Sequence, residues 1–180
     1  MTERTFVPLS IAVLTVSDTR TAADDRSGDT LVERLEAAGH TLVDRRIVPD
    51  DIEAIRDAVL GWSRDPAVDV VITTGGTGFT GRDVTPEALE PIFDKRMDGF
   101  SAVFHRISFE KIGVSTIQSR ATAGVVNATF VFALPGSPGA CRDGWDGILG
   151  AQLDYRHRPC NFVEIMPRLD EHLRRGGRSA

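Results

Sequence analysis

Two aspartates are the residues of this sequence that most directly suggest chemistry. Asp50 follows the second of the apolar segments that predict buried strands, and Asp83 lies in the loop after the third. Ligands of open α/β sheets bind beyond the carboxyl ends of the strands, so we expect both carboxylates at one edge of the sheet. A pair of carboxylates there could hold Mg²⁺ against the phosphates of a nucleotide. Asp50 has an alternative role as the N-cap of the helix that follows it.

The loop that contains Asp83 is rich in glycine, and residues 74–83 read Thr-Gly-Gly-Thr-Gly-Phe-Thr-Gly-Arg-Asp. Such a loop can direct several backbone N–H groups towards one anion. Its four glycines, Gly75, Gly76, Gly78 and Gly81, fall within seven residues. The spacing from Gly76 to Gly81 also matches the dinucleotide-binding fingerprint. However, Pro86 predicts that the next helix begins too late for that motif, which favours a phosphate site. A turn that needs glycine only for its backbone geometry is the alternative.

The start of the last long helical segment is a second place suited to an anion. Residues 134–139 read Leu-Pro-Gly-Ser-Pro-Gly, with Ser137 as a candidate N-cap and Pro138 at the first helical position. A helix N-terminus offers free N–H groups and the positive end of the helix dipole. The start of this helix is therefore a candidate anion site, and a capped helix without a ligand is the alternative.

Two polar segments adjoin other expected strands. Residues 17–20, Ser-Asp-Thr-Arg, follow the first strand, and their Ser, Thr and Arg side chains could hold a phosphate or a polar ring. Ser119 and Arg120 precede a later strand, and a guanidinium suits a planar or phosphate anion. The alternatives are a polar loop without a ligand for the first segment and a surface ion pair for Arg120.

The elements that must position these residues are short apolar, β-branched runs and amphipathic helical patterns, which mostly alternate. The expected strands are residues 11–16, 41–48, 68–74, 121–126 and 129–134. The expected helices include residues 31–38, 52–62, 85–112 and 137–153. This order predicts an α/β fold in three layers, α/β/α, with a mostly parallel sheet.

Composition excludes several classes of protein. The formal net charge of −5 over 180 residues argues against a nucleic-acid-binding protein that uses a broad basic face. Hydrophobic residues make up 41% and charged residues 26% of the chain, which excludes bulk disorder. The length predicts one domain over residues 1–170, and we expect the arginine- and glycine-containing end, 171–180, to be a flexible tail.

The cysteines and the N-terminal segment predict the cellular compartment. Cys141 and Cys160 lack Cys-x-x-Cys spacing, and the four histidines are scattered. We therefore expect reduced thiols in a cytoplasmic protein and no structural zinc. The longest apolar stretch near the N-terminus is short, so we expect neither a signal peptide nor a membrane span.

Residues 97–112 carry an unusual number of apolar side chains for one helix. They include Met97, Phe100, Val103, Phe104, Ile107, Phe109 and Ile112. One face of a sheet does not readily cover that much apolar surface, and exposed patches of this kind mark interfaces. The segment therefore predicts a homo-oligomer, and a fully buried helix is the alternative.

Taken together, the motifs resemble the MoaB/MogA family of molybdenum cofactor biosynthesis proteins. The resemblance rests on the order and spacing of residues 15–20, 73–78, 82–88 and 134–139, and it extends over residues 6–169. Residues 108–121 and 158–162 are more similar to the MoaB branch than to the MogA branch. The resemblance implies a molybdopterin-binding-like fold that assembles as a trimer or as a hexamer built from two trimers.

The resemblance also implies a reaction, the Mg²⁺-dependent transfer of AMP from ATP to the phosphate of molybdopterin with release of pyrophosphate. It implies that Asp50 and Asp83 are the catalytic and Mg²⁺-holding residues. The resemblance implies that the nucleotide is bound by Gly75, Gly76, Thr77 and Gly78. Implied for molybdopterin are Ser17, Asp18, Ser119, Arg120, Pro135, Gly136 and Ser137.

Some members of the MoaB branch lack the two aspartates, whereas this chain keeps both and is therefore expected to be an active nucleotidyltransferase. Ala121 departs from relatives that have serine there. Two alternatives remain: a non-catalytic protein that binds molybdopterin or a nucleotide, and a trimeric scaffold. The absence of a second domain from the 180 residues disfavours the scaffold.

Overall fold

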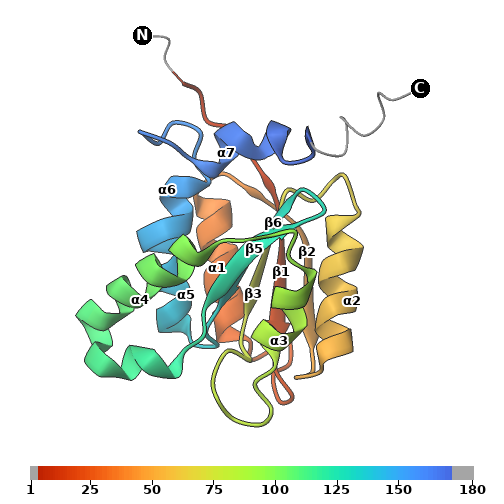
Figure 1. Ribbon diagram of the computed structural model, residues 1–180, viewed down its shortest axis with the longest axis vertical. Coiled ribbons are helices and arrows are strands. Elements are labelled where there is room, and N and C mark those ends of the chain that lie inside the picture. The colour runs from red at the N-terminus through yellow and green to blue at the C-terminus, as the bar shows by residue number, and fades with distance from the viewer. Residues whose placement is uncertain (1–3, 172–180) are drawn as a thin grey trace.

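The structure is a computed structural model that describes residues 4–171. A six-stranded sheet forms its middle layer (Figure 1). The strands are β1 (Ser10–Val16), β2 (Thr41–Val48), β3 (Val70–Thr74), β4 (Lys95–Arg96), β5 (Thr122–Val126) and β6 (Thr129–Leu134). Their order is β2-β1-β3-β6-β5-β4, and β2, β1, β3 and β6 are parallel to one another. The antiparallel pairs are β6 with β5 and β5 with β4, so the predicted mostly parallel sheet is confirmed.

Helices cover both faces of this sheet. One face carries α1 (Arg26–Ala37), α4 (Asp98–Ile112), α5 (Pro138–Gly144), α6 (Gly150–Gln152) and α7 (Phe162–Ile165). The other face carries α2 (Ile52–Ser63) and α3 (Thr85–Leu89). Side chains of β1 alternate between the two sides: Ile11 and Val13 join the first core, and Leu14 joins the second. The predicted three-layer α/β/α fold is therefore confirmed.

The segment from 85 to 112 is not the single helix that its pattern predicts. After α3 comes a 3₁₀ turn (Glu90–Ile92), then β4, and only then α4. The backbone turns into the sheet here because Asp94 N donates to Val125 O (2.8 Å) and Met97 N donates to Ala123 O (2.8 Å). This non-local pairing with β5 overrides the local helical pattern.

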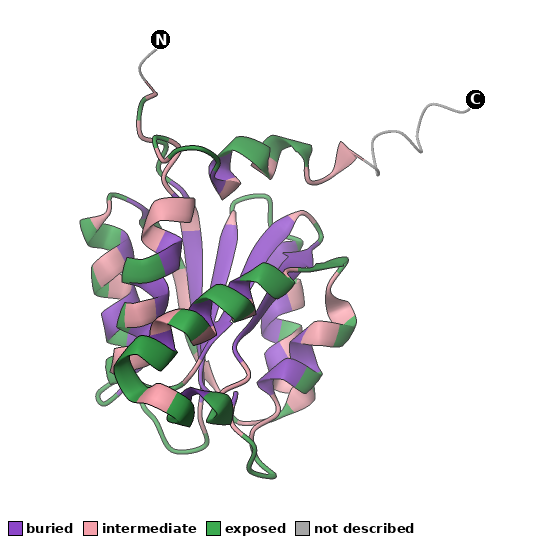
Figure 2. Cartoon of the chain, turned by 60° about the vertical axis from the view of Figure 1, so that its left-hand side comes forward, coloured by how far each residue is buried: buried purple, intermediate pink, exposed green. Residues whose placement is uncertain are grey.

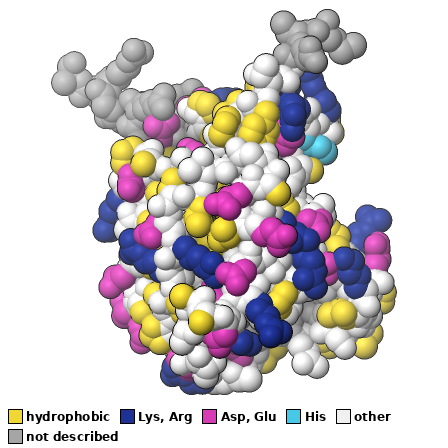
Figure 3. Space-filling model, turned by 180° about the vertical axis from the view of Figure 1, so that it is seen from behind, with side chains coloured by type: hydrophobic (Ala, Val, Ile, Leu, Met, Phe, Trp, Pro, Cys, Tyr) yellow, Lys and Arg dark blue, Asp and Glu magenta, His cyan; other side chains and the backbone are white. Residues whose placement is uncertain are grey.

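The end of the chain and the surface bear on two further predictions. Most of the predicted tail, residues 172–180, lies outside the described residues. Within residues 4–171, no helix combines the length and the apolar character needed to cross a membrane. On the face seen in Figure 3, basic and acidic side chains are interspersed.

Candidate functional site

The topology identifies the edge of the sheet where a ligand would bind. The chain passes from β1 to β2 on one side and returns to β3 on the other, while α1 and α2 cover opposite faces. A crevice outside the carboxyl ends of β1 and β3 is the usual result of such a reversal. A small cavity of about 70 Å³ lies there, and residues at the ends of β1 and β3 line it together with Gly136, which follows β6.

The glycine-rich loop after β3 enters this crevice with backbone geometry that requires glycine. Gly75 has a φ of +102° and Gly76 a φ of +64°. A Cβ on Gly75 would lie 2.2 Å from Val16 O, and one on Gly76 would lie 2.4 Å from Thr85 Oγ1. A Cβ on Gly136 would lie 3.0 Å from Gly75 Cα. The three strand ends thus approach one another more closely than larger residues would allow.

Thr85 fixes the start of the loop, although its sequence position suggests that it caps the next helix. The helix instead begins at Thr85, with Val84 at the cap position and no side-chain cap. The buried Thr85 hydroxyl donates to Gly75 O (2.8 Å), and Thr85 N donates to Gly76 O (2.9 Å). The Thr85 hydroxyl therefore holds the glycine loop and does not cap α3.

Asp50 and its neighbour Asp51 have different partners. Asp51 is the N-cap of α2 and accepts from Ala54 N (2.8 Å), which removes the alternative capping role of Asp50. Asp50 pairs instead with Asp18 after β1: Asp18 N donates to Asp50 Oδ2, and Asp50 N donates to Asp18 Oδ1, both at 3.1 Å. The structure therefore brings the loops after β1 and β2 together at the crevice.

Asp83 is held by its own loop. Its Oδ2 accepts from Thr80 N (2.9 Å) and from Thr80 Oγ1 (2.6 Å). Burial alone would raise the pKa of Asp83, but the hydrogen bonds from Thr80 and Gly78 outweigh it and lower that pKa. Asp83 therefore remains ionised at neutral pH.

The carboxylates of this edge influence one another. Burial raises the pKa of Asp50, and the negative charges of Asp18 and Asp83 raise it further. The hydrogen bond from Arg82 lowers the pKa of Asp18, and so does its bond from Asp50 N. An additional cation at this edge would therefore be stabilised.

Magnesium fits this set of donors if phosphates complete its coordination. Within residues 4–171, no three His, Cys, Asp or Glu side chains gather closely enough to hold a metal ion by themselves. Mg²⁺ in nucleotide sites commonly takes one or two carboxylates together with phosphate oxygens and water. The described residues donate to Asp50 only at Oδ2, so Oδ1 remains available. Asp50 and Asp83 therefore suit Mg²⁺ that arrives with a nucleotide.

Arg120 contacts the outside of the glycine loop. Its guanidinium donates to Gly78 O (2.9 Å) and Asp83 O (3.0 Å), pairs with Glu87 and lies over the Phe79 ring. Its backbone N–H donates to Thr77 O (2.9 Å). Arg120 therefore forms the ion pair that was the alternative to a ligand contact, with Glu87 as its partner. It also fastens the loop to α3.

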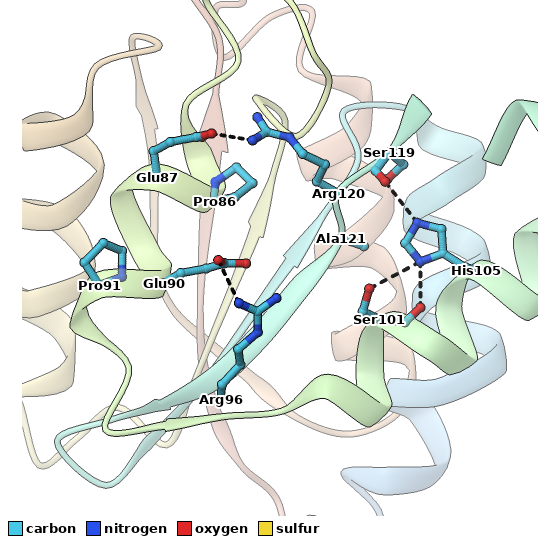
Figure 4. A pocket seen from close by; sticks show the side chains of 10 residues that line it. All are labelled: Pro86, Glu87, Glu90, Pro91, Arg96, Ser101, His105, Ser119, Arg120 and Ala121. Atoms are coloured by element: carbon cyan, nitrogen blue, oxygen red, sulfur yellow. Dashed lines mark hydrogen bonds and ion pairs between the residues drawn. The ribbon is translucent and has the colours of Figure 1, made fainter. Parts of the chain in front are cut away.

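Ser119 and Arg120 also line a larger cavity of about 470 Å³ between α3, β4 and α4 (Figure 4). His105 spans part of its wall, with Nδ1 2.7 Å from Ser101 O and Nε2 2.9 Å from Ser119 O. The Ser119 hydroxyl is buried without a hydrogen-bond partner among the described residues. In this cavity Ser119 lies beside Arg120 and Glu87, the residues that hold the Asp83 loop.

The remaining predicted residues lie at the crevice. Ser17 Oγ accepts from Thr19 N and Arg20 N, both at 3.2 Å, so it organises the loop after β1. Ser137 is the N-cap of α5 and accepts from Ala140 N (3.1 Å), as predicted. Pro135 precedes this cap, and its carbonyl accepts from Thr74 Oγ1 (3.0 Å).

Sequence reasoning missed the buried Asp25, which lines the small cavity. Asp25 is 1% exposed and accepts from Thr15 Oγ1 (2.7 Å), Arg45 Nη2 (2.7 Å) and Gly28 N (2.9 Å). It is the N-cap of α1, a position that an Asp just before a helical pattern could have suggested. Sequence reasoning also gave no role to Arg82, although it adjoins Asp83.

Comparisons with known proteins agree with this geometry. A family model described as a probable molybdopterin binding domain matches residues 12–155. Molybdenum cofactor biosynthesis protein B of Escherichia coli (strain K12) is 52% identical over 157 residues, which cover 87% of this chain and 92% of that protein. A crystal structure of molybdenum cofactor biosynthesis protein B matches with a TM-score of 0.84 at 38% identity, covering 93% of this chain and 99% of that one.

A further match is the crystal structure of the tungsten cofactor synthesizing protein MoaB from Pyrococcus furiosus. It has a TM-score of 0.65 at 34% identity and covers 96% of this chain and 98% of that one. The matches therefore extend over nearly the whole length of chain and relatives alike. The chain belongs to the molybdopterin-binding family of molybdenum cofactor biosynthesis proteins, as its motifs predict.

Proposed function

We propose that this protein is a molybdopterin adenylyltransferase that transfers AMP from ATP to the phosphate of molybdopterin. The observation that carries the proposal is the convergence of Asp50, Asp83 and the glycine loop at the crevice between β1 and β3. Relatives named molybdenum cofactor biosynthesis protein B support the pathway and molybdopterin as the substrate. A cytoplasmic location is part of this proposal, because ATP is an intracellular substrate.

The proposed reaction needs positioning and charge more than proton transfer. A phosphate oxygen of molybdopterin attacks the α-phosphorus of ATP, and the bond to the β-phosphate breaks as pyrophosphate leaves. The attacking oxygen is already anionic, so no strong general base is required. When bound, Mg²⁺ neutralises charge on the phosphates. Asp50 and Asp83 would hold it, and the amides of Gly75, Gly76, Thr77 and Gly78 would stabilise the phosphates.

The segments proposed to hold molybdopterin surround this loop. They are Ser17 and Asp18 after β1, Pro135, Gly136 and Ser137 before α5, and Ser119 and Arg120 before β5. In the proposed site, Arg120 acts mainly by holding the glycine loop, because its guanidinium already bonds two of the loop's carbonyl oxygens. The unpartnered Ser119 hydroxyl is available for a polar group of the pterin.

The proposed enzyme is a homo-oligomer, a trimer or a hexamer. Figure 2 shows exposed residues along α4 and the turn that follows it, on the outer side of the molecule. The exposed apolar side chains of this surface are Val103, Phe109, Ile112, Val114 and Ile117. We call these five residues the α4 patch.

The substitution Asp83→Asn tests the proposed function. It keeps the size of the side chain and its ability to accept from Thr80, but it removes the charge that would hold Mg²⁺. We expect pyrophosphate release with molybdopterin, ATP and Mg²⁺ to fall by orders of magnitude, while molybdopterin binding and the fold are retained. The lowered pKa of Asp83 predicts only a modest fall in melting temperature at neutral pH. Asp57→Asn, which removes an exposed carboxylate from α2, is the matched control and should leave release unchanged.

Two outcomes would contradict the proposal. If Asp83→Asn releases pyrophosphate at the rate of the unchanged protein, Asp83 does not take part in the reaction. If the unchanged protein binds both ligands but releases no pyrophosphate, the protein is a non-catalytic binding protein. Repeating the assay with other nucleoside triphosphates identifies the nucleotide.

A further inference from the structure

Arg82 spans the mouth of the crevice. It belongs to the glycine loop after β3, and its guanidinium reaches Asp18 in the loop after β1. The contact has two parallel hydrogen bonds: Nε donates to Asp18 Oδ2 and Nη2 donates to Asp18 Oδ1, both at 2.8 Å. The Arg82 side chain is 66% exposed and that of Asp18 is 37% exposed, so water reaches this contact. The pair therefore connects the two loops between which the proposed nucleotide would enter.

Arg82 is the counter-ion of the acidic residues at this mouth of the crevice. The hydrogen bond with Asp18 raises the pKa of Arg82, and the charges of Asp18, Asp50 and Asp51 add to this effect. Asp18 Oδ1 also accepts from Asp50 N, so the ion pair and the Asp50 contact share one carboxylate. Three acidic residues thus face one guanidinium in the ligand-free protein.

A bound triphosphate with its metal would change this balance. A cation held by Asp50 and Asp83 would neutralise the acidic edge, and the phosphates would bring new negative charge to it. An arginine fork matches the oxygens of a phosphate as well as those of a carboxylate. Asp18, by contrast, can only repel a phosphate.

We propose that Asp18–Arg82 is an exchangeable latch in which Arg82 leaves Asp18 and binds a phosphate oxygen of the incoming triphosphate. This inference rests on the proposed function, because it assumes that a triphosphate enters between these loops. Exposed ion pairs contribute little stability, so their exchange is easy. The latch makes Arg82 a phosphate-binding residue and gives Asp18 the role of holding it in the absence of ligand.

A double-mutant cycle with inorganic tripolyphosphate and Mg²⁺ tests the latch by calorimetry at fixed ionic strength. Arg82→Gln should weaken tripolyphosphate binding roughly tenfold or more, as loss of a charged hydrogen bond does. Asp18→Asn frees Arg82 and should tighten binding roughly two- to fivefold. In the Arg82→Gln background the same Asp18 substitution should give a clearly smaller gain. Arg82→Lys, which keeps the charge without the fork, should fall between Arg82→Gln and the unchanged protein.

The ion pair of Arg34 and Asp146 is the matched control. It is also a two-point contact (2.9 and 3.2 Å), but it lies at the other end of α1 from the crevice. Arg34→Gln and Asp146→Asn should leave tripolyphosphate affinity unchanged, and melting curves check that every variant folds. An unchanged affinity in Arg82→Gln overturns the latch. An Asp18→Asn gain of equal size in both backgrounds also overturns it, because it indicates only general charge repulsion.

The assay of pyrophosphate release separates this inference from the proposed function. If the Asp18 and Arg82 substitutions are coupled in their effects on tripolyphosphate affinity but the unchanged protein releases no pyrophosphate, the latch stands and adenylyl transfer is rejected. Pyrophosphate release without coupling between Asp18 and Arg82 rejects the latch alone. If tripolyphosphate does not bind the unchanged protein, the latch is rejected.

Discussion

Asp51 caps α2, whereas Asp50 beside it faces the carboxylates of the crevice. Burial and neighbouring negative charge raise the pKa of Asp50, so its ionised form is less stable in the folded protein than in the unfolded chain. The free energy of unfolding therefore falls as the pH rises above 3.8, the ordinary value for this carboxyl, through the raised pKa. A residue whose ionised form destabilises the folded protein is characteristic of a binding site rather than of a structural position.

Replacing Asp50 by Asn should therefore stabilise the protein at pH 7. The amide oxygen can still accept from Asp18 N, and the variant loses only the unfavourable charge. Because the site is partly exposed, we expect a gain of roughly 0.2–1 kcal/mol, or a rise in Tm of about 1–3 °C. Thermal melts at several pH values measure it, and the gain should shrink as the pH falls towards 3.8.

Asp51→Asn is the control for this prediction, because it removes the same charge from the adjacent residue and keeps a good N-cap. Its Tm should not rise. A gain for Asp50→Asn that is the same at low and neutral pH would contradict the electrostatic explanation. Loss of pyrophosphate release together with the rise in Tm would connect the stored destabilisation to the proposed reaction.

At the scale of elements, the glycine loop combines a left-handed backbone that glycine adopts readily with stabilising contacts. Gly76→Ala would place a residue with a Cβ at φ +64°, 2.4 Å from the Thr85 hydroxyl that bonds to Gly75 O. We expect a loss of roughly 2–3 kcal/mol in the free energy of unfolding, from the left-handed conformation and the disturbed hydrogen bond. Urea unfolding measures this loss.

Gly81→Ala is the matched control within the same loop. Nothing lies within 4 Å of a Cβ built on Gly81, and its φ is not in the left-handed region. Its free energy of unfolding should change by less than about 0.5 kcal/mol. If Gly76→Ala and Gly81→Ala unfold alike, position 76 does not require glycine.

The sequence predicts a helix or strand well when nearby residues determine it, and poorly when contacts with distant residues determine it. The strand predicted at 41–48 is observed as Thr41–Val48, because its β-branched residues and the flanking Gly39 and Pro49 determine it locally. The segment 85–112 was mispredicted because its interruption depends on β5, about thirty residues later in the chain. A helical pattern holds no information about a distant strand that competes for its backbone.

The same distinction applies to the site. The edge that gathers Asp50, Asp83 and Gly76 follows from parallel strand order, which the sequence predicts. The contacts of Arg120 with Gly78 and Asp83 join residues 42 and 37 positions apart, and no local pattern indicates them. The sequence therefore predicts where the candidate site lies. Only the structure shows which of its residues are free to contact a ligand and which, like Arg120, hold the loop.

At the scale of the whole molecule, the distribution of exposed apolar side chains bears on whether the protein assembles into an oligomer. Phe100 and Phe104, which the sequence counted towards an apolar interface, are buried in the core. The described part of the chain exposes nine large apolar side chains, and five of them form the α4 patch. Such a concentration on α4 and the turn that follows it favours contact with a second copy of the chain.

We predict that the protein in solution has a mass that is a multiple of 19.6 kDa and that the α4 patch causes this assembly. Val114 and Ile117 are each 72% exposed, so changing both to Glu should leave the fold intact while placing charge in the interface. Light scattering should then give the monomer mass, with an unchanged Tm, because each buried apolar side chain contributes about 1.5–3 kcal/mol to association. Ile165→Glu, on α7 outside the patch, should keep the oligomer. A monomeric mass for the unchanged protein at micromolar concentration would reject the assembly, and an oligomer in the Val114 and Ile117 double variant would place the interface elsewhere.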